Sequence, residues 1–211
     1  MESGSPDAQG GLDRCAALLR EVDHRVKNNL QLISAVIQLQ SRRTADAAAR
    51  QALRTAVQRV SAIAAVHRRV YRTEGREVLD LAQMVRELVA DLAAAAGRDG
   101  ITLQMALDAI VIDAPQGGPL ALLVSELVGN ALQHAFPDGR TGMVGVGLLR
   151  TADGFVLTVA DDGAGVEDPA GLSRGFGLTM AQMLCQQLRA TLDLTDARPG
   201  LQATVTVPMA A

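Results

Sequence analysis

The chain has 211 residues, of which 48% are apolar, and a formal net charge of −3 with both signs spread along its length. This length fits one large domain or two small ones. One Tyr, three Phe and no Trp leave few platforms for stacking bases, and the charge excludes a strongly basic surface for nucleic acid or anionic membranes. Aliphatic and Ala side chains must build the core, which favours helices.

No apolar run reaches the 18 residues typical of a membrane-spanning helix, and the N-terminal residues are polar. We therefore expect a cytoplasmic protein without a signal peptide. Cys15 and Cys185 are far apart in helix-like runs, so free thiols are preferred over a disulfide. Residues 1–11, which are rich in Gly, Ser, Pro and Asp, are predicted to form a disordered tail.

The following segment predicts two long helices that form an antiparallel hairpin. In residues 12–43 the apolar side chains recur every three or four positions, which places them along one stripe. A break near Thr44, with Thr44 or Asp46 as a cap, precedes a second helix over about residues 45–72. Two helices cannot cover their own apolar seam, so we expect a homodimer in which two hairpins form a four-helix bundle.

A polar block interrupts the first helix around His24. Helical spacing places Glu21 on one side of His24, and Lys27 and Asn28 on the other. This arrangement offers an imidazole nucleophile, a carboxylate for its ring N–H, and a cation and an amide for an incoming phosphate. A single His on an amphipathic helix is more often an ordinary surface residue, and for His67 on the second helix we expect that role.

From Val78 onward, helices alternate with strands of mostly antiparallel character, which predicts an α+β two-layer sandwich. A helix over 81–96 is expected, with Asp80 as its N-cap and Gly97 as its stop. Pro115, Gly117 and Gly118 indicate a turn before an apolar helix over 120–136. A further helix is predicted over 177–190, and strands over 101–107, 109–113, 143–150, 155–161, 190–196 and 202–208.

The apolar helix over 120–136 carries Glu126, Asn130 and His134 at four-residue steps, so they share one face. A carboxylate and an amide that face a core need polar partners. Mg²⁺ is one candidate because it takes oxygen ligands, few of them from protein. Structural hydrogen bonds are an equally good explanation for Glu126 and Asn130. His134 is placed where it could approach a phosphate.

Two glycine-containing segments follow this helix. Asp161 ends a predicted strand and opens the sequence Asp-Asp-Gly-Ala-Gly, and an Asp at a strand end can accept a hydrogen bond from an exocyclic amine. Glycines let the backbone approach a ligand closely, and a helix N-terminus favours anions. In this order the segments predict a nucleotide site. Its candidate residues are Asp161, Gly163, Gly165, Gly175, Gly177 and Leu178.

The segments ELVGNALQHAF, DDGAG and GFGLTMA resemble the N, G1 and G2 boxes of the GHKL (Bergerat-fold) ATPase superfamily. The segment HRVKNNLQ resembles the phosphoacceptor box of the HisKA_2 histidine kinases, which are close to the HWE kinases. Together these matches span about residues 15–208. The resemblance implies a helical hairpin followed by a GHKL-type sandwich.

The resemblance also implies roles for single residues. His24 would be phosphorylated from ATP, Asn130 would bind Mg²⁺ directly, and Glu126 would assist through water or as a base. Asp161 would accept a hydrogen bond from the adenine amino group, and the four glycines would shape the pocket and its lid. Asn28 matches a position that in some relatives orients water for dephosphorylation of the partner.

The implied organisation is a tail (1–11), a dimerisation and phosphotransfer hairpin (12–75) and a catalytic ATP-binding domain (76–211). The expected partners are a response-regulator receiver domain, whose Asp takes the phosphoryl group, and a separate sensor protein, because no sensor domain is expected in the chain. The chain departs from the pattern in two ways. Arg25 stands where many histidine kinases carry an acid, and no Phe-containing box separates Gly165 from Gly175, so the lid is short.

Two other functions remain possible on the sequence alone. The first is a histidine phosphotransfer relay whose ATP-binding domain is inactive, although an inactive domain need not retain Glu126, Asn130 and Asp161. The second is a Ser/Thr kinase of the anti-sigma type or another GHKL ATPase. Such proteins lack the hairpin that bears the histidine.

Overall fold

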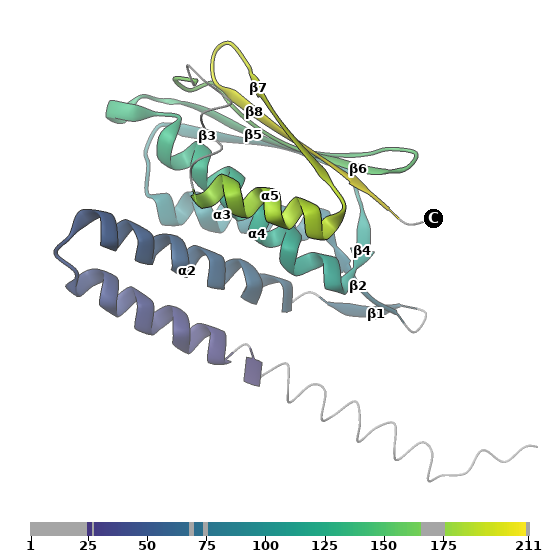
Figure 1. Ribbon diagram of the computed structural model, residues 1–211, viewed down its shortest axis with the longest axis horizontal. Helices are drawn as coiled ribbons and strands as arrows, with labels where there is room; N and C mark the ends of the chain where they lie inside the picture. The colour runs from purple at the N-terminus through teal and green to yellow at the C-terminus, as the bar shows by residue number, and fades with distance from the viewer. Residues whose placement is uncertain (1–24, 27, 68–69, 74–75, 166–175, 210–211) are drawn as a thin grey trace, which may run out of the picture. The chain divides into compact units, whose positions relative to one another are not determined.

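A computed structural model describes residues 25–26, 28–67, 70–73, 76–165 and 176–209 of the protein (Figure 1). By its internal contacts the chain divides into two compact units, Met1–Arg68 and Arg69–Ala211. Among the described residues, no helix combines the length and the apolarity needed to cross a membrane.

The first unit is a helical hairpin that turns at the expected break. One helix covers residues 28–43, and α2 (Ala47–His67) follows after a short connection. Asp46 caps α2, because its Oδ1 accepts a hydrogen bond from the Ala49 N–H at 2.6 Å. Across the turn, the Ser41 hydroxyl donates to the Arg50 carbonyl at 3.4 Å. The expected hairpin is therefore present, while residues 12–24 of its first helix lie outside the described residues.

The second predicted helix is shorter than expected at its C-terminal end. It ends at His67, and residues Tyr71–Thr73 form strand β1 instead of continuing the helix to residue 72. β1 pairs antiparallel with β2 (Arg76–Asp80), with Tyr71 opposite Val78. Backbone pairing with β2 therefore prevails over the helical periodicity at this point. This explains why the second unit already begins at Arg69.

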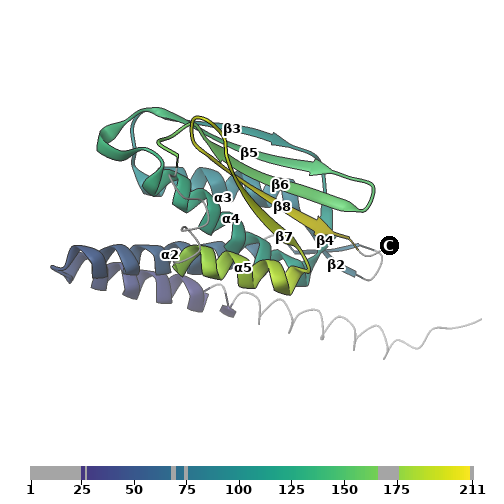
Figure 2. The same cartoon turned by 45° about the horizontal axis from the view of Figure 1, so that its top comes forward.

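The second unit is a two-layer sandwich, as expected. Figures 1 and 2 show helices α3 (Leu81–Ala96), α4 (Ala114–His134) and α5 (Phe176–Leu188) on one face of a five-stranded sheet. The sheet has the strand order β3-β5-β6-β8-β7, and β2 joins β1 and β4 in a second, three-stranded sheet. The remaining strands are β3 (Ile101–Leu107), β4 (Val111–Asp113), β5 (Gly142–Arg150), β6 (Gly154–Asp161), β7 (Thr191–Asp196) and β8 (Leu201–Pro208).

The register of the sheet decides where Asp161 points. Side chains alternate between the two faces of a strand, so Phe155, Leu157, Val159 and Asp161 of β6 share one face. The three apolar side chains of this set are buried against the helix layer. β6 pairs antiparallel with β5, and Asp161 lies opposite the buried Val144. The Asp161 carboxylate therefore lies at the end of a row of β6 side chains that face the core.

Local capping fixes α3 as the sequence predicts. The Asp80 side chain accepts a hydrogen bond from the Gln83 N–H at 2.9 Å, and Gly97 ends the helix in the left-handed conformation at φ +57°. A cap of this kind stabilises a helix by about 1 kcal/mol. The apolar face of α3 is buried, with Leu81, Met84 and Val85 almost fully inaccessible.

Helix α4 starts earlier than the sequence suggested. The predicted turn at Pro115, Gly117 and Gly118 is wrong, because α4 already begins at Ala114. Pro115 occupies the first turn, where a backbone N–H has no helical partner to lose and the fixed φ of proline suits the helix. The helix therefore gains six residues before the apolar run that carries Glu126.

The C-terminal end of α4 is held by an arginine from the loop after α3. The Arg98 guanidinium donates to the carbonyl of Leu132 at 2.9 Å and also to the carbonyl of Phe136. The last carbonyls of a helix have no partner within the helix, and a cation is favoured beside them. Arg98 thus fixes the end of α4 that bears His134.

Candidate functional site

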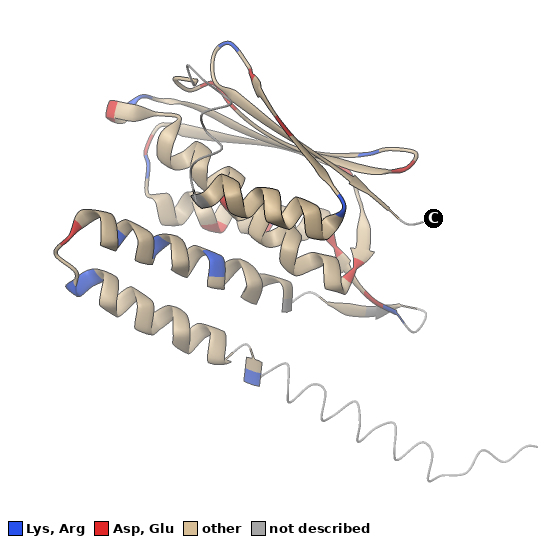
Figure 3. Ribbon diagram, in the orientation of Figure 1, with Lys and Arg blue, Asp and Glu red and all other residues tan. Residues whose placement is uncertain are grey.

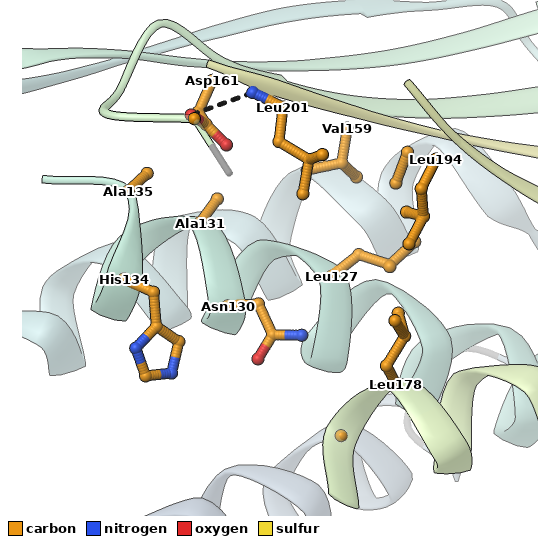
Figure 4. A pocket seen from close by; sticks show the side chains of 13 residues that line it. Leu127, Asn130, Ala131, His134, Ala135, Val159, Asp161, Leu178, Leu194 and Leu201 are labelled. Carbon is orange, nitrogen blue, oxygen red and sulfur yellow. Dashed lines mark hydrogen bonds between the residues drawn. The ribbon is translucent and has the colours of Figure 1, made fainter. Parts of the chain in front are cut away.

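A cavity of about 460 Å³ opens between α4, the N-terminal end of α5 and the sheet (Figure 4). Helix α4 supplies one wall, strands β6, β7 and β8 supply the facing wall, and α5 contributes its first turn. Its lining residues are Leu127, Asn130, Ala131, His134, Ala135, Val159, Asp161, Gly165, Gly177, Leu178, Leu194, Leu201 and Ala203. Aliphatic side chains and glycine backbone therefore surround a small number of polar groups.

The three polar side chains on one face of α4 become more exposed toward the C-terminal end of the helix. Glu126 is 5% exposed, Asn130 is half-buried and His134 is exposed. Figure 4 shows Asn130 and His134 pointing to the same side of α4, away from the sheet. The four-residue spacing thus produces the shared face that the sequence predicts. Buried Glu126 and half-buried Asn130 form the inner part of this face.

Gly177 brings the start of α5 onto these two α4 side chains. A Cβ at position 177 would lie 2.9 Å from Glu126 Oε2, and 3.4 and 3.5 Å from the two amide atoms of Asn130. A glycine at this position lets the α5 backbone lie close to the carboxylate and the amide without displacing either side chain. The G2-like glycine and the N-box-like residues therefore belong to one site.

Asp161 stands on the sheet side of the cavity. Its Oδ1 accepts hydrogen bonds from the backbone N–H groups of Gly163, at 3.0 Å, and Leu201, at 3.3 Å. Figure 4 shows the bond to Leu201 as a dashed line above the cavity. Within the described part of the chain no group donates a hydrogen bond to Oδ2. The carboxylate is thus held by one oxygen and can present the other to a ligand.

Burial is the main influence on the ionisation of Asp161. Desolvation raises the pKa of its carboxyl above the usual range. The N–H groups of Gly163 and Leu201 oppose this effect because they favour the charged form, and the nearby Asp162 carboxylate adds to the rise in pKa. The net result is a raised pKa for a carboxyl group that lines the cavity.

The turn after Asp161 is packed tightly against the end of α4. A Cβ at Gly163 would lie 2.2 Å from the Ala135 carbonyl oxygen, and the Ala164 N–H donates to that same oxygen at 2.8 Å. Gly165 adopts φ +69° and lines the cavity. Gly163 therefore allows the turn to pack against the end of α4, whereas Gly165 lines the cavity.

The cavity has little positive charge in its described walls. None of its lining residues is Lys or Arg, and α5 carries no charged residue at all (Figure 3). Within the described residues no group of three His, Cys, Asp or Glu could hold a metal ion. A Mg²⁺ ion that takes most of its ligands from phosphate and water needs only one or two protein oxygens, which Asn130 and Glu126 offer. The donor set therefore fits Mg²⁺ accompanied by a polyphosphate.

The structure brings most of the predicted nucleotide residues to one place and leaves the predicted phosphoacceptor region undescribed. Asn130, His134, Asp161, Gly165, Gly177 and Leu178 line the cavity, and Glu126 and Gly163 lie directly behind it. Glu21, His24, Lys27 and Gly175 lie outside the described residues. Asn28, at the start of the described helix over 28–43, is exposed.

Sequence reasoning missed the aliphatic residues of the cavity. Period-two alternation could have found Val159, two residues before Asp161, and the pair Leu201 and Ala203 on β8. Four-residue spacing on α4 could have found Leu127, Ala131 and Ala135. No local signal in the sequence indicates that the Leu201 N–H bonds the Asp161 carboxylate, because forty residues separate them.

The two-layer fold of the second unit is that of the histidine kinase-like ATPase class. Residues 101–204 match the histidine kinase-like ATPase domain, and residues 21–96 match the histidine kinase family HisKA_2. The chain belongs to the histidine kinases that combine these two parts, as the sequence motifs predict.

Two sensor or light-activated histidine kinases are similar to most of the chain. The sensor histidine kinase PdtaS of Mycobacterium tuberculosis is 34% identical over 199 residues, which cover 92% of this chain and 40% of PdtaS. Blue-light-activated histidine kinase 2 of Erythrobacter litoralis is 30% identical over 215 residues, which cover 99% of this chain and 61% of that protein. The chain therefore spans about 40% of the length of the mycobacterial relative.

A solved structure agrees with the fold. The histidine kinase domain of the Erythrobacter litoralis EL346 blue-light activated histidine kinase aligns with a TM-score of 0.68 at 26% sequence identity. The alignment covers 90% of this chain and 92% of that domain. The helical part and the sandwich together are thus similar to a known histidine kinase domain.

Proposed function

We propose that this chain is an ATP-dependent protein histidine kinase. ATP occupies the cavity, His24 takes its γ-phosphoryl group, and an Asp of a response-regulator receiver domain takes the group from His24. The observation that carries this proposal is a single cavity with the Asp161 carboxylate on its sheet side and the Asn130–Glu126 pair beside the start of α5. The Asp161 carboxylate can accept a hydrogen bond from the exocyclic amine of a base. The Asn130–Glu126 pair can supply oxygen ligands to a cation that is bound to phosphate.

The base would lie among the aliphatic side chains, where its flat faces lose water. The free oxygen of Asp161 would accept from the amino group, and the positive end of the α5 dipole would face the phosphates beside His134. Asn130 and Glu126 would hold Mg²⁺, which supplies neutralisation of the phosphate charge. Positioning and charge neutralisation account for most catalysis in phosphoryl transfer.

In the transfer step a ring nitrogen of His24 forms a P–N bond to the γ-phosphorus. The bond from that phosphorus to the bridging oxygen breaks, and ADP leaves with the electron pair. Glu21 and Glu126 are the proposed acceptors of the imidazole proton, and Lys27 and Asn28 are the proposed phosphate and water contacts. The roles of Glu21, His24 and Lys27 are supported by the sequence pattern alone.

We also propose that the hairpin forms a homodimer. Leu32, Val36 and Leu39 on the helix over residues 28–43 are 65%, 56% and 52% exposed, and residues 28–41 carry no charge. An uncharged, apolar helix surface of this kind is typical of a face that another helix covers. Input from a sensor is part of the proposal, because the relatives are named sensor and blue-light-activated histidine kinases.

Incubation of the full chain with γ-labelled ATP tests the kinase proposal. We expect a protein-bound label that is labile in acid and stable in base. The label should not form when EDTA removes Mg²⁺ before ATP is added. It should move to a receiver domain when one is supplied. Absence of label from ATP, with phosphate still accepted from a phosphorylated receiver, would favour the phosphotransfer relay. An acid-stable label or free phosphate alone would favour a Ser/Thr kinase or a simple ATPase.

The raised pKa of Asp161 predicts how ATP binding depends on pH. The ionised carboxylate accepts a hydrogen bond from the adenine amino group more strongly than the neutral carboxyl does, so affinity for ATP should fall as pH falls through a range higher than that of an ordinary Asp. Folding stability should depend on pH with the opposite sign. Because the folded pKa exceeds the unfolded one, the stability linked to Asp161 is present at low pH and is lost as pH rises through the folded pKa.

Calorimetric titration with ATP between about pH 4 and pH 7 checks this expectation. In the Asp161→Asn variant the additional pH dependence should disappear. The expectation is wrong if wild-type affinity decreases only in the range of an ordinary aspartate.

A further inference from the structure

The turn between β7 and β8 contacts Asp161 more closely than its distance in the sequence suggests. A Cβ built on Gly200 would lie 1.8 Å from the Asp161 carbonyl oxygen and 2.9 Å from Asp161 Oδ1. Gly200 also adopts φ +96°, a conformation that L side chains rarely take. Both the contact and the conformation therefore require a glycine at this position.

The residue after Gly200 completes the contact. The Leu201 N–H donates to Asp161 Oδ1 at 3.3 Å, beside the bond from the Gly163 N–H to the same oxygen. Two donors on one oxygen fix the carboxylate about its last torsion, which is otherwise broad. The second oxygen is thereby left for the cavity (Figure 4).

The turn is stiffened by bonds of its own. The Ala197 N–H donates to the Gly200 carbonyl at 3.0 Å. Asp196 accepts from the Arg198 N–H at 3.2 Å and from Arg198 Nε at 3.0 Å. On its other side the turn meets the G1-like loop, because a Cβ at Gly165 would lie 3.4 Å from the Gly200 carbonyl oxygen. The turn thus links the edge of the sheet to the loop that lines the cavity.

We propose that Gly200 and the backbone N–H of Leu201 are positioning residues that orient the Asp161 carboxylate toward the base, so that the β7–β8 turn takes part in base selection. This inference rests on the proposed binding of ATP in the cavity. It adds a third chain segment to the two glycine segments that the sequence pattern indicates. Neither Gly200 nor the Leu201 N–H needs to touch the phosphates or the reacting atoms.

The test compares ATP with purine riboside triphosphate, which lacks the 6-amino group. The full-length wild type should bind ATP at least about tenfold more tightly, because a buried acceptor left without its donor is costly. Gly200→Ala should reduce this ratio to about one by weakening ATP binding, with little change for the analogue. A merely structural role for Gly200 would weaken both nucleotides equally.

Gly139→Ala is the matched control. Gly139 also has a positive φ, +76°, but a Cβ there would meet nothing within 4 Å, and Gly139 does not line the cavity. This variant should show the backbone strain of the substitution without the contact at Asp161, and should keep the wild-type ratio. Unfolding by urea, measured on both variants, separates lost stability from lost selection.

A second variant tests the inference if Gly200→Ala fails to fold. Asp196→Ala removes both bonds to Arg198 at an exposed site and should reduce the ratio by about threefold. The inference is overturned if a folded Gly200→Ala, or Asp196→Ala in its place, keeps the wild-type ratio, or if both nucleotides weaken equally. If the wild type binds neither nucleotide, the proposed function fails and not this inference alone.

Discussion

Asp161→Asn is expected to weaken ATP binding by about 100-fold, because it places a donor where the base presents a donor. Oδ1 of Asp161 already accepts from the Gly163 and Leu201 N–H groups. The amide oxygen of an asparagine would take that place, so its NH₂ group would face the adenine amino group. Loss of a hydrogen bond to a charged group costs about 1.5–3 kcal/mol, and the opposed donors add to it.

The same geometry predicts a change in preference. An NH₂ group can donate to a 6-oxo purine, so inosine triphosphate should lose far less affinity than ATP, or gain some. Asp162→Asn is the matched control, because Asp162 does not line the cavity. Its Oδ1 accepts a hydrogen bond from the Met143 N–H at 2.6 Å, and the amide oxygen of an asparagine can keep this bond. Titration calorimetry with both nucleotides measures the effect. Equal loss for ATP and inosine triphosphate would contradict the assigned orientation of Asp161.

The sequence predicts the part of the fold that depends on local signals. Asp80 and Gly97 bound α3 as expected, because each satisfies backbone groups within its own turn. The turn at Asp46 is likewise set by a side chain three residues from its partner. The two-layer architecture follows from the alternation of helical and strand periodicity.

The errors arise where distant pairing or context outweighs local preference. Helical periodicity continues past His67, but β1 forms there because β2 offers it a backbone partner. Pro115 and Gly117 are typical turn residues, yet both lie in α4 because the first turn of a helix tolerates proline. These positions could not be decided without the rest of the fold.

The site shows the same division. Glu126, Asn130 and His134 could be grouped from spacing alone, since they lie on one helix. The order of the glycine segments and the resemblance of the motifs predict that Asp161 and Gly177 lie near them, and both residues line the cavity together with Asn130 and His134. The contribution of Gly200 and Leu201 depends on the pairing of β6 with β8, which places Ala160 opposite Gln202, the residues next to Asp161 and Leu201. No pattern within either segment reveals that contact.

The largest effect is expected at His24, the proposed phosphoacceptor. The chain contains three histidines, His24, His67 and His134, so substitution of each by Ala identifies the labelled residue. His24→Ala should lose acid-labile label by more than about 1,000-fold, because no other group would form the P–N bond. ATP affinity of that variant should stay at the wild-type value. His134→Ala should retain label at a reduced rate, because it leaves His24 intact.

Incubation of the wild type, His24→Ala and His67→Ala with γ-labelled ATP is therefore the most direct test of the account. We predict equal acid-labile label on the wild type and on His67→Ala, and none on a His24→Ala variant that still binds ATP. Acid-labile label that persists in His24→Ala would contradict the assignment of His24 as the residue that receives the phosphoryl group.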